Sequence, residues 1–390
     1  MRVSLKLGMF AAAATAAVIG AAVLGTTPLG AAQMPAPAAG VPQFRVDPTW
    51  PKDLPNQWII QSVTGMFVDR DDNVWVLNTP RAISDNESDA EKNPPIAECC
   101  RRAPAVIKFS PQGDVLASWG GPGHAPGWPT SEHTIFTDSQ GNVWIAGSQA
   151  GDTLMQFSPD GRLLRDFGKR GPKFEGPANT QPMNNQQTEL LLRGVAAATL
   201  DEPANEIYVA DGYLNKRVLV FDLRSGAFKR GWGAYGMPLA QISNANPPAH
   251  NPNGPPLRDY RPAVHCAQIA RDGLVYVCDR GGNRIQVFNK QGQFQKEFIV
   301  ANNTLNRGSA GSVSFSHDPE QRFLYMSDIQ NAVVWILDRQ SGQVVGRFGR
   351  RGYNAGQFML LHIAVADSRG NMYTGEVAEA GRVQKFVPAR

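Results

Sequence analysis

The chain lacks a marked excess of either charge. Its 390 residues include 38 Lys and Arg against 34 Asp and Glu, and only 18% of the residues are charged. Nucleic acids are bound through a strongly basic face, so this composition gives no support to a nucleic-acid partner. The 42% share of apolar residues is typical of a globular protein and excludes a disordered chain or a coiled coil.

Long apolar runs are also absent, except near the N-terminus. Residues 7–24 form an Ala-rich apolar run that follows Arg2 and Lys6, and small residues close the segment at position 32. We interpret residues 1–32 as a signal peptide and the Pro- and Ala-rich residues 33–43 as a linker. The protein is then exported, to a periplasm or out of the cell, with an uncleaved N-terminal membrane anchor as the alternative. We expect no integral membrane domain after it.

Cysteines are few, and an exported protein can oxidise them. Cys266 and Cys278 flank a turn, so they face each other across a hairpin and either form a disulfide or pack as two small apolar residues. Cys99 and Cys100 are adjacent in a long loop. For this second pair a vicinal disulfide, a soft metal site and two free thiols all stay open.

Glycine and proline are plentiful, with 39 and 29 residues, and they punctuate a repeat. One copy reads EHTIFTDSQGNVWIAGS followed by LMQFSPDGRLLRDFGKRG, which predicts four short strands joined by tight turns. Six such copies follow one another, but the sixth ends after three strands. Residues 44–50 (FRVDPTW) can supply the missing strand. The sequence therefore predicts an all-β, six-bladed β-propeller over residues 44–390, closed by its own N-terminal strand.

The insertions fall on one side of this ring. Segments 79–104, 172–192 and 237–262 all follow the second or the fourth strand of a copy. Those strands end on the same face, which we call the loop face, whereas the other face carries only tight hairpin turns and is called the turn face. Binding chemistry on a rigid scaffold is expected on the loop face.

Three of the six histidines share one position of the repeat. His133, His265 and His362 each stand eight residues before the glycine of a hairpin turn, in copies two, four and six. Alternate blades should bring these imidazoles, the histidine trio, together at the mouth of the central channel, with a fourth position open. A single histidine at a strand start is usually an ordinary hydrogen-bonded residue. Three in one register favour a catalytic zinc site.

Two acids lie near the expected ligands. If the two strands of each predicted hairpin pair without a shift in register, Asp279 stands opposite His265 and Glu376 stands opposite His362. Either carboxylate is then placed to orient an imidazole, as acids often do behind metal ligands. The alternative is that both acids only cap loops at the strand ends.

Two segments have a recognisable form. The stretches DGYLNKRVLVF, from Asp211 to Phe221, and DRGGNRIQVF, from Asp279 to Phe288, resemble NHL repeats. Together with the histidine trio, they make most of residues 55–390 similar to the lyase domain of the peptidylglycine α-amidating enzymes. In that family three histidines bind zinc, a tyrosine acts as base, and arginines bind the substrate. The lyase converts a peptidyl-α-hydroxyglycine into a peptide amide and glyoxylate.

The resemblance assigns roles to particular residues of this chain. The trio would hold zinc, Tyr213 would be the base and Arg280 would bind the substrate, a peptide or another small molecule. The second arginine of the family is displaced by two residues, to Arg81. Ile363 stands where the family has an acid that helps to bind calcium, so a calcium ion has little support.

Other functions fit the same scaffold. Zinc-assisted hydrolysis of an ester or lactone could use the same open position, although lactonases of this fold usually build their site from oxygen ligands around calcium. A non-catalytic exported binding module is the third possibility, because the fold alone decides nothing. The sequence makes no prediction of an oligomeric partner.

Overall fold

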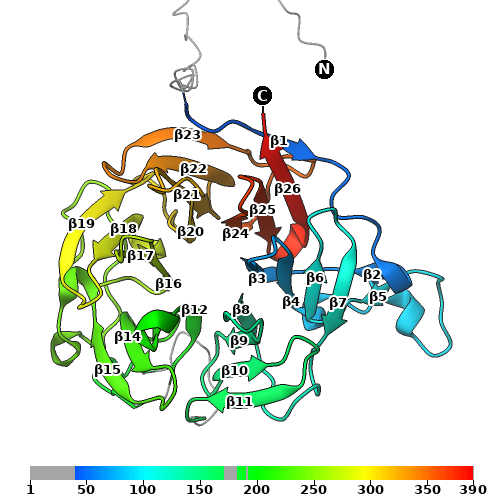
Figure 1. The fold of residues 1–390 in the computed structure, drawn as a ribbon, viewed down its shortest axis with the longest axis horizontal. Coiled ribbons are helices and arrows are strands. Elements are labelled where there is room, and N and C mark those ends of the chain that lie inside the picture. Colours follow the sequence, from blue (N-terminus) through cyan, green and yellow to red (C-terminus); the bar gives the residue numbers. More distant parts are fainter. Residues whose placement is uncertain (1–39, 171–181, 190–191, 390) are drawn as a thin grey trace, which may run out of the picture. The chain divides into compact units, whose positions relative to one another are not determined.

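The computed structural model describes residues 40–389 apart from 171–181 and 190–191. The predicted signal peptide, most of the predicted linker and part of the segment 172–192 lie outside the described residues. The described chain forms six four-stranded antiparallel sheets, the blades, arranged around a central axis (Figure 1). This arrangement is the predicted six-bladed β-propeller. No described helix has the length and apolar character needed to cross a membrane.

The strands of each blade run outward from the axis in chain order. Blade 1 has β3 (Val63–Val68), β4 (Val74–Asn78), β6 (Val106–Phe109) and β7 (Val115–Trp119). Blade 2 has β8 (Glu132–Thr137), β9 (Val143–Gly147), β10 (Leu154–Phe157) and β11 (Leu163–Phe167). Blade 3 has β12 (Val195–Asp201), β13 (Glu206–Asp211), β14 (Arg217–Asp222) and β15 (Phe228–Trp232).

The second half of the ring repeats this order. Blade 4 has β16 (Val264–Ile269), β17 (Val275–Asp279), β18 (Arg284–Phe288) and β19 (Phe294–Ile299). Blade 5 has β20 (Ser312–Phe315), β21 (Phe323–Asp328), β22 (Val333–Asp338) and β23 (Val344–Phe348). Blade 6 has β24 (Leu361–Ala366), β25 (Met372–Glu376), β26 (Val383–Pro388) and, as its outer strand, β1 (Phe44–Asp47).

The ring is closed by the two ends of the described chain. β1 pairs antiparallel with β26, with Phe44 opposite Pro388 and Asp47 opposite Lys385. This confirms the predicted closure, although the strand ends at Asp47 rather than at residue 50. Pro48 has no backbone N–H to continue the pairing, which accounts for the earlier end.

The core lies between neighbouring blades. In β17, Val275 and Val277 pack against blade 3, whereas Tyr276 and Cys278 pack against blade 5, and all four side chains are buried. Such a strand is covered on both faces, so it reads as a continuous apolar run. Each fully buried side chain of this size contributes about 1.5–3 kcal/mol to folding. The blades therefore hold one another in fixed positions around the axis.

Tight hairpins keep the turn face plain. Between β8 and β9, the carboxylate of Asp138 accepts hydrogen bonds from the backbone N–H groups of Gln140 and Asn142, at 3.0 and 2.9 Å. Gly141 has a positive φ of 81° that closes the turn. The turn between β24 and β25 repeats this arrangement at Asp367 and Gly370.

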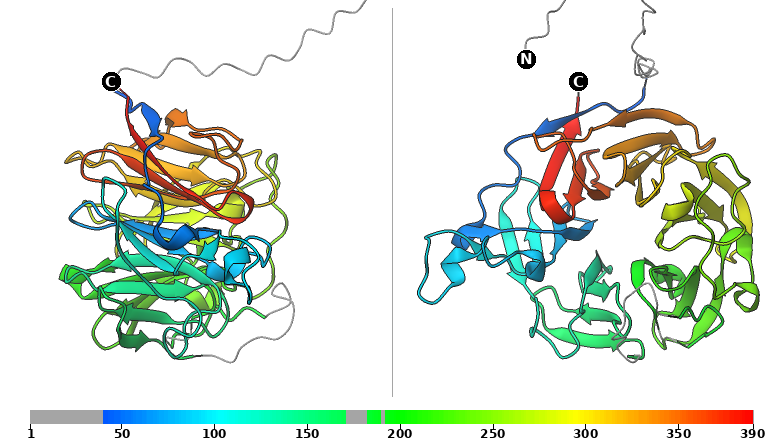
Figure 2. Two further views of the ribbon diagram at one scale, coloured as in Figure 1. Left: turned by 90° about the vertical axis from the view of Figure 1, so that its right-hand side faces the viewer. Right: turned by 180° about the vertical axis from the view of Figure 1, so that it is seen from behind.

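The long segments join strand ends on the loop face, and Figure 2 shows the ring from its edge and from behind. Short 3-10 helices lie in them and elsewhere in the ring: Pro55–Gln57, Pro80–Ala82, Asp89–Glu91, Glu202–Ala204, Ala234–Gly236, Leu239–Gln241, Arg280–Gly282 and Ala378–Ala380. In the segment 79–104, β5 (Arg101–Arg102) pairs in parallel with β2 (Trp58–Ile59). Asn185 donates hydrogen bonds to Ser243 and Asn244, so the segments at blade 3 support each other.

Both cysteine pairs are disulfide-bonded. Cys266 and Cys278 are directly opposed on β16 and β17, with their Cα atoms 4.8 Å apart, and both are buried. Cys99 and Cys100 form a vicinal disulfide in the loop between blade 1's second and third strands. The described chain has no free cysteine.

Candidate metal centre

Each histidine of the trio is the extra residue of a β-bulge. Glu132 and Thr134 pair with the consecutive residues Gly147 and Ala146, so His133 between them has no partner across the ladder. The same shift occurs at His265 in β16 and at His362 in β24. A β-bulge turns the side chain of its extra residue in a new direction. Each of these three bulges lies at the start of the inner strand of its blade. All three imidazoles therefore point into the ring.

The trio converges at the axis. The ring centroids are 5.3 Å apart for His133 and His265, and 4.9 Å apart for each pair that includes His362. One nitrogen of each imidazole lies within 4.8 Å of the others, which is close enough for one metal ion to be shared. All three side chains are buried. β8, β16 and β24, which carry them, alternate around the axis in Figure 1.

Backbone carbonyls of the intervening blades fix the orientation of the imidazoles. His133 Nδ1 lies 2.8 Å from the carbonyl oxygen of Ala196, and His265 Nδ1 lies 2.6 Å from that of Gly311. A carbonyl only accepts, so each Nδ1 carries the proton and each Nε2 has a free lone pair. Metal-binding histidines commonly have such a partner behind the ring.

His362 has the same relation to blade 1, in a looser form. The backbone of Thr64 raises the pKa of His362, although His362 Nδ1 has no partner within hydrogen-bond geometry. The residues present therefore fit a metal ion bound by three imidazole nitrogens.

The surroundings keep the trio neutral. Burial lowers the pKa of His133 to about 4, and the positive charge of Arg280 acts in the same direction. Burial, again as the largest cause, holds the pKa values of His265 and His362 well below the usual value. Metal ligation requires neutral imidazoles, so no proton has to be displaced from the trio at neutral pH.

Tyr213 contacts the trio from the loop face, and Arg280 contacts Tyr213. The Tyr213 hydroxyl lies 2.7 Å from His133 Nε2 and 3.0 Å from His265 Nε2. Its backbone N–H donates to Gly194, which fixes the residue just after β13. Arg280 begins the 3-10 helix after β17, and its Nη1 lies 3.5 Å from the Tyr213 hydroxyl. The buried Nε of Arg280 has no partner among the described residues.

One further cation was missed by the sequence analysis. Arg307, in the loop between blades 4 and 5, lies close enough to lower the pKa of His362, as a smaller cause than burial. It follows no recognised motif. The only indication of Arg307 in the sequence was its position in the segment that joins blades 4 and 5 on the loop face.

The two acids do not orient the imidazoles, which corrects the prediction for Asp279 and Glu376. The bulges shift the register by one residue, so Asp279 pairs with Val264 and Glu376 pairs with Leu361. Asp279 binds Arg284 Nε at 2.8 Å and the backbone N–H of Arg261, and Glu376 binds Arg382. Asp211 binds Arg217 in the same way in blade 3, which has no histidine at this position. Each acid therefore stabilises the loop at the end of its own strand and the arginine at or near the start of the next strand.

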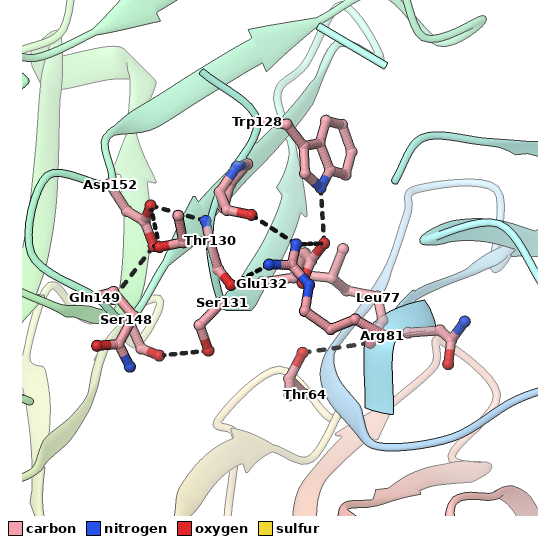
Figure 3. Close-up of polar contacts among 12 residues, drawn as sticks. Thr64, Leu77, Arg81, Trp128, Thr130, Ser131, Glu132, Ser148, Gln149 and Asp152 are labelled. Atoms are coloured by element: carbon pink, nitrogen blue, oxygen red, sulfur yellow. Dashed lines mark hydrogen bonds and ion pairs between the residues drawn. The ribbon is translucent and has the colours of Figure 1, made fainter. Parts of the chain in front are cut away.

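Arg81 is engaged elsewhere. Figure 3 shows its guanidinium between the loop before β8 and the buried carboxylate of Glu132, with Nη2 2.9 Å from Glu132 Oε1. It also donates to the carbonyls of Pro129 and Thr130. Trp128 Nε1 donates to the same Glu132 oxygen at 2.7 Å. No contact joins Arg81 to the trio among the described residues, so its predicted role in substrate binding is not supported.

A cavity of about 360 Å³ lies in the channel on the turn-face side of the trio. Its walls combine apolar side chains, such as Met66, Ile135 and Ile363, with serine and threonine side chains. Glu202 is the only acid among the lining residues, and its carboxylate accepts hydrogen bonds from Ser139. Calcium is usually bound by several oxygen ligands that include carboxylates, and the cavity lining supplies a single carboxylate, so the calcium prediction gains no support here.

Comparisons with known proteins agree with this architecture. No family model matches the chain. It is 25% identical over 296 residues to human NHL repeat-containing protein 3, covering 73% of each chain. It is 24% identical over 267 residues to peptidyl-glycine alpha-amidating monooxygenase A of Xenopus laevis, covering 66% of this chain and 24% of that protein. It is also 24% identical over 270 residues to peptidyl-glycine alpha-amidating monooxygenase B of Xenopus laevis, covering 26% of that protein. The chain is thus a six-bladed β-propeller that is similar to NHL repeat-containing protein 3 and to part of the peptidyl-glycine alpha-amidating monooxygenases.

Proposed function

We propose that this protein is a zinc-dependent lyase that cleaves a peptidyl-α-hydroxyglycine-like carbinolamide into an amide and glyoxylate. The observation that carries the proposal is the meeting of the trio, Tyr213 and Arg280 at one point of the loop face. The similarity to the amidating proteins supports the same reaction class.

The donor set favours zinc. Three neutral imidazole nitrogens with an open position suit zinc and do not suit calcium or magnesium, which prefer oxygen ligands. His133 and His265 would hold the ion through Nε2, because Nδ1 of each of these two rings faces a backbone carbonyl, and His362 would supply the third imidazole nitrogen. When bound, zinc supplies a Lewis acid that polarises an oxygen atom of the substrate.

The side chains around the trio provide the other steps. The Tyr213 hydroxyl, which is in hydrogen-bond contact with two imidazoles, relays the proton: it accepts the proton of the substrate hydroxyl as it passes its own proton to the departing nitrogen. The carbon–oxygen double bond of glyoxylate forms as the carbon–nitrogen bond breaks, and the departing nitrogen takes up the proton to become the amide. Arg280 holds the carboxylate of the substrate through its unpartnered Nε and its Nη1.

The test couples a metal assay to a product assay. The full chain, loaded with zinc, should contain about one zinc ion and release glyoxylate from a synthetic peptidyl-α-hydroxyglycine. Tyr213→Phe should lower kcat by about 10²- to 10⁴-fold, because its hydroxyl transfers a proton in the reaction. The variant should keep its zinc, because the three imidazoles hold the metal.

Each alternative predicts a different outcome of this test. A zinc-loaded protein that releases no glyoxylate would exclude this substrate, and an undiminished Tyr213→Phe variant would exclude the base. Release of acid from an ester or lactone, without glyoxylate, would favour the hydrolase. Zinc with neither activity would favour the binding module. Export is also part of the proposal, and the two disulfides support an oxidising compartment.

A further inference from the structure

The cavity on the turn-face side of the trio connects the trio with the surface. Its lining comes mainly from the inner strands β3, β8, β12, β16, β20 and β24 and begins at the three imidazoles. At its other end it includes His317, which is exposed, and Glu202, which is partly exposed. Between these ends, Thr199 and Gln268 are also partly exposed, although both belong to inner strands. The cavity is therefore a passage from the turn face to the trio, which we call the axial channel.

The walls of the axial channel suit a hydrated cation. Each inner strand is the end strand of its sheet, so its edge toward the axis carries backbone N–H and C=O groups that no strand pairs with. Hydroxyl groups of serine and threonine and the amide of Gln268 add further oxygen atoms. Among the described residues of the lining, none is a lysine or an arginine. Carbonyl and hydroxyl oxygens can replace the water around a cation, and no fixed positive charge in the lining opposes its passage.

The turn-face end of the axial channel is negatively charged. Glu202 accepts hydrogen bonds from Ser139 and forms no ion pair within the described part of the chain, while Arg70 donates to the Ser139 carbonyl instead. The six hairpins that surround this end carry nine aspartates and glutamates and only four arginines. These hairpins are residues 69–73, 138–142, 202–205, 270–274, 316–322 and 367–371. Such an entrance raises the local concentration of cations and speeds their arrival.

The loop-face side of the trio is covered and positively charged. The Tyr213 hydroxyl lies 2.7 Å from His133 Nε2 and 3.0 Å from His265 Nε2. Arg280 Nη1 lies 3.5 Å from the same hydroxyl, and the Nε of this arginine has no partner among the described residues. A divalent cation that approaches from the loop face therefore meets a guanidinium group and then a hydroxyl bound to two of its ligands. Repulsion by this charge slows that approach.

We propose that the metal ion enters and leaves the trio through the axial channel, from the turn face, whereas the loop face serves the substrate. Glu202 then attracts the ion at the entrance, and Thr199 is part of the wall that the ion passes. The inference rests on the metal binding at the trio that the proposed function requires, but it does not rest on the lyase reaction.

The first test narrows the axial channel and measures zinc exchange. Zinc-loaded full chain is mixed with excess EDTA to measure release, and the chelated chain is mixed with zinc and a zinc-sensitive dye to measure uptake. Thr199→Phe should slow both rates by the same factor, about tenfold, and leave the Kd for zinc unchanged, because a barrier on a path does not alter its end states. Thr188→Phe is the matched control, since Thr188 is exposed in a loop-face segment outside the lining. It should leave both rates unchanged.

The second test removes the charge at the entrance. Glu202→Gln should lower the rate of zinc uptake about twofold to fivefold at low ionic strength, and the difference should disappear at high salt. Glu98→Gln is the matched control, because Glu98 is an exposed acid in the loop-face segment 79–104 and lies outside the lining. Its uptake rate should equal that of the unaltered protein. Circular dichroism shows whether each of the four variants is folded.

The outcomes separate this inference from the proposed reaction. Unchanged rates in a folded Thr199→Phe, or a change in its Kd without an equal change in both rates, would overturn the axial route. If Thr199→Phe does not fold, Glu202→Gln decides, and an uptake rate equal to that of Glu98→Gln at low ionic strength would overturn it. Absence of zinc binding would reject the site and the route together. Absence of glyoxylate release, with both rates slowed as expected, would reject only the lyase.

Discussion

Odd and even blades share one backbone plan and differ in what they bring to the axis. Thr64 in blade 1 and Ala196 in blade 3 are bulged like the histidines of blades 2, 4 and 6. The even blades contribute imidazole side chains, whereas the odd blades contribute main-chain carbonyls at Ala196, Gly311 and Thr64. The candidate site is therefore made by all six blades, in two alternating chemical roles.

This difference explains the residues of the odd blades. A carbonyl is present whatever the side chain, so Thr, Ala and Gly serve equally well behind the imidazoles. The even blades have no such freedom, because only the side chain can bind a metal. Substitutions at equivalent positions should then have very different effects in the two sets of blades.

The most drastic way to test the comparison is to remove a side chain from each set. His265→Ala should reduce the zinc content from about one ion per chain to almost none, because two imidazoles remain. Thr64→Ala changes the equivalent residue of blade 1 and keeps the carbonyl, so its zinc content should stay the same. Elemental analysis measures the zinc content of both variants, and circular dichroism shows whether each variant is folded. Similar zinc contents would contradict the division of roles.

The next largest effect concerns the strand-end acids, which both sets of blades carry. Asp279→Asn in blade 4 and Asp211→Asn in blade 3 each break a buried ion pair with an arginine. We expect each to lower the free energy of unfolding by about 3–5 kcal/mol, measured by urea titration.

Zinc content per folded chain should be unchanged in both aspartate variants. If Asp279 oriented His265, only Asp279→Asn would weaken zinc binding, by about 10- to 100-fold. Equal behaviour of the two variants would show that these acids serve the fold in every blade where they occur.

The smallest expected effect is a pH dependence of the even blades in the metal-free protein. His133 has a folded pKa of about 4, below the ordinary value of 6.5. Between these pH values the unfolded chain binds a proton that the folded chain does not, so stability falls as the pH falls through this range. His133 alone accounts for at most about 3 kcal/mol of this loss.

Urea titrations of the chelated protein between pH 7 and pH 4 measure this effect. His133→Gln should show a shallower decline of the free energy of unfolding over this range than the unaltered protein. An equal decline in both proteins would mean that the buried imidazole is not the source.

The repeat made much of this architecture predictable. Counting residues from a hairpin glycine back to a strand start places His133, His265 and His362 in one register, because antiparallel hairpins preserve spacing. The bulges could not be predicted, since no residue type marks them. They shift the pairing by one residue, which is why Asp279 was expected opposite His265 and lies opposite Val264 instead.

Contacts between distant segments were equally hidden. Arg81 has an ordinary sequence context, and only the folded chain shows that Glu132 of the next blade holds it. Arg307 was missed for a similar reason, because the loop that carries it meets the backbone of Arg280 only through a close approach at Gly308. Local spacing predicts what one hairpin does, whereas loop-to-loop contacts depend on the whole ring.

The pairing of β1 with β26 also imposes an order on biosynthesis. β1 precedes every other described strand and has no partner in the sheet until β26, the last of them, has been made. His362, in the same blade, is likewise among the late arrivals. A chain made only as far as blade 5 thus has an open seam and two of the three imidazoles, so the full set of candidate metal ligands exists only once the last blade is complete.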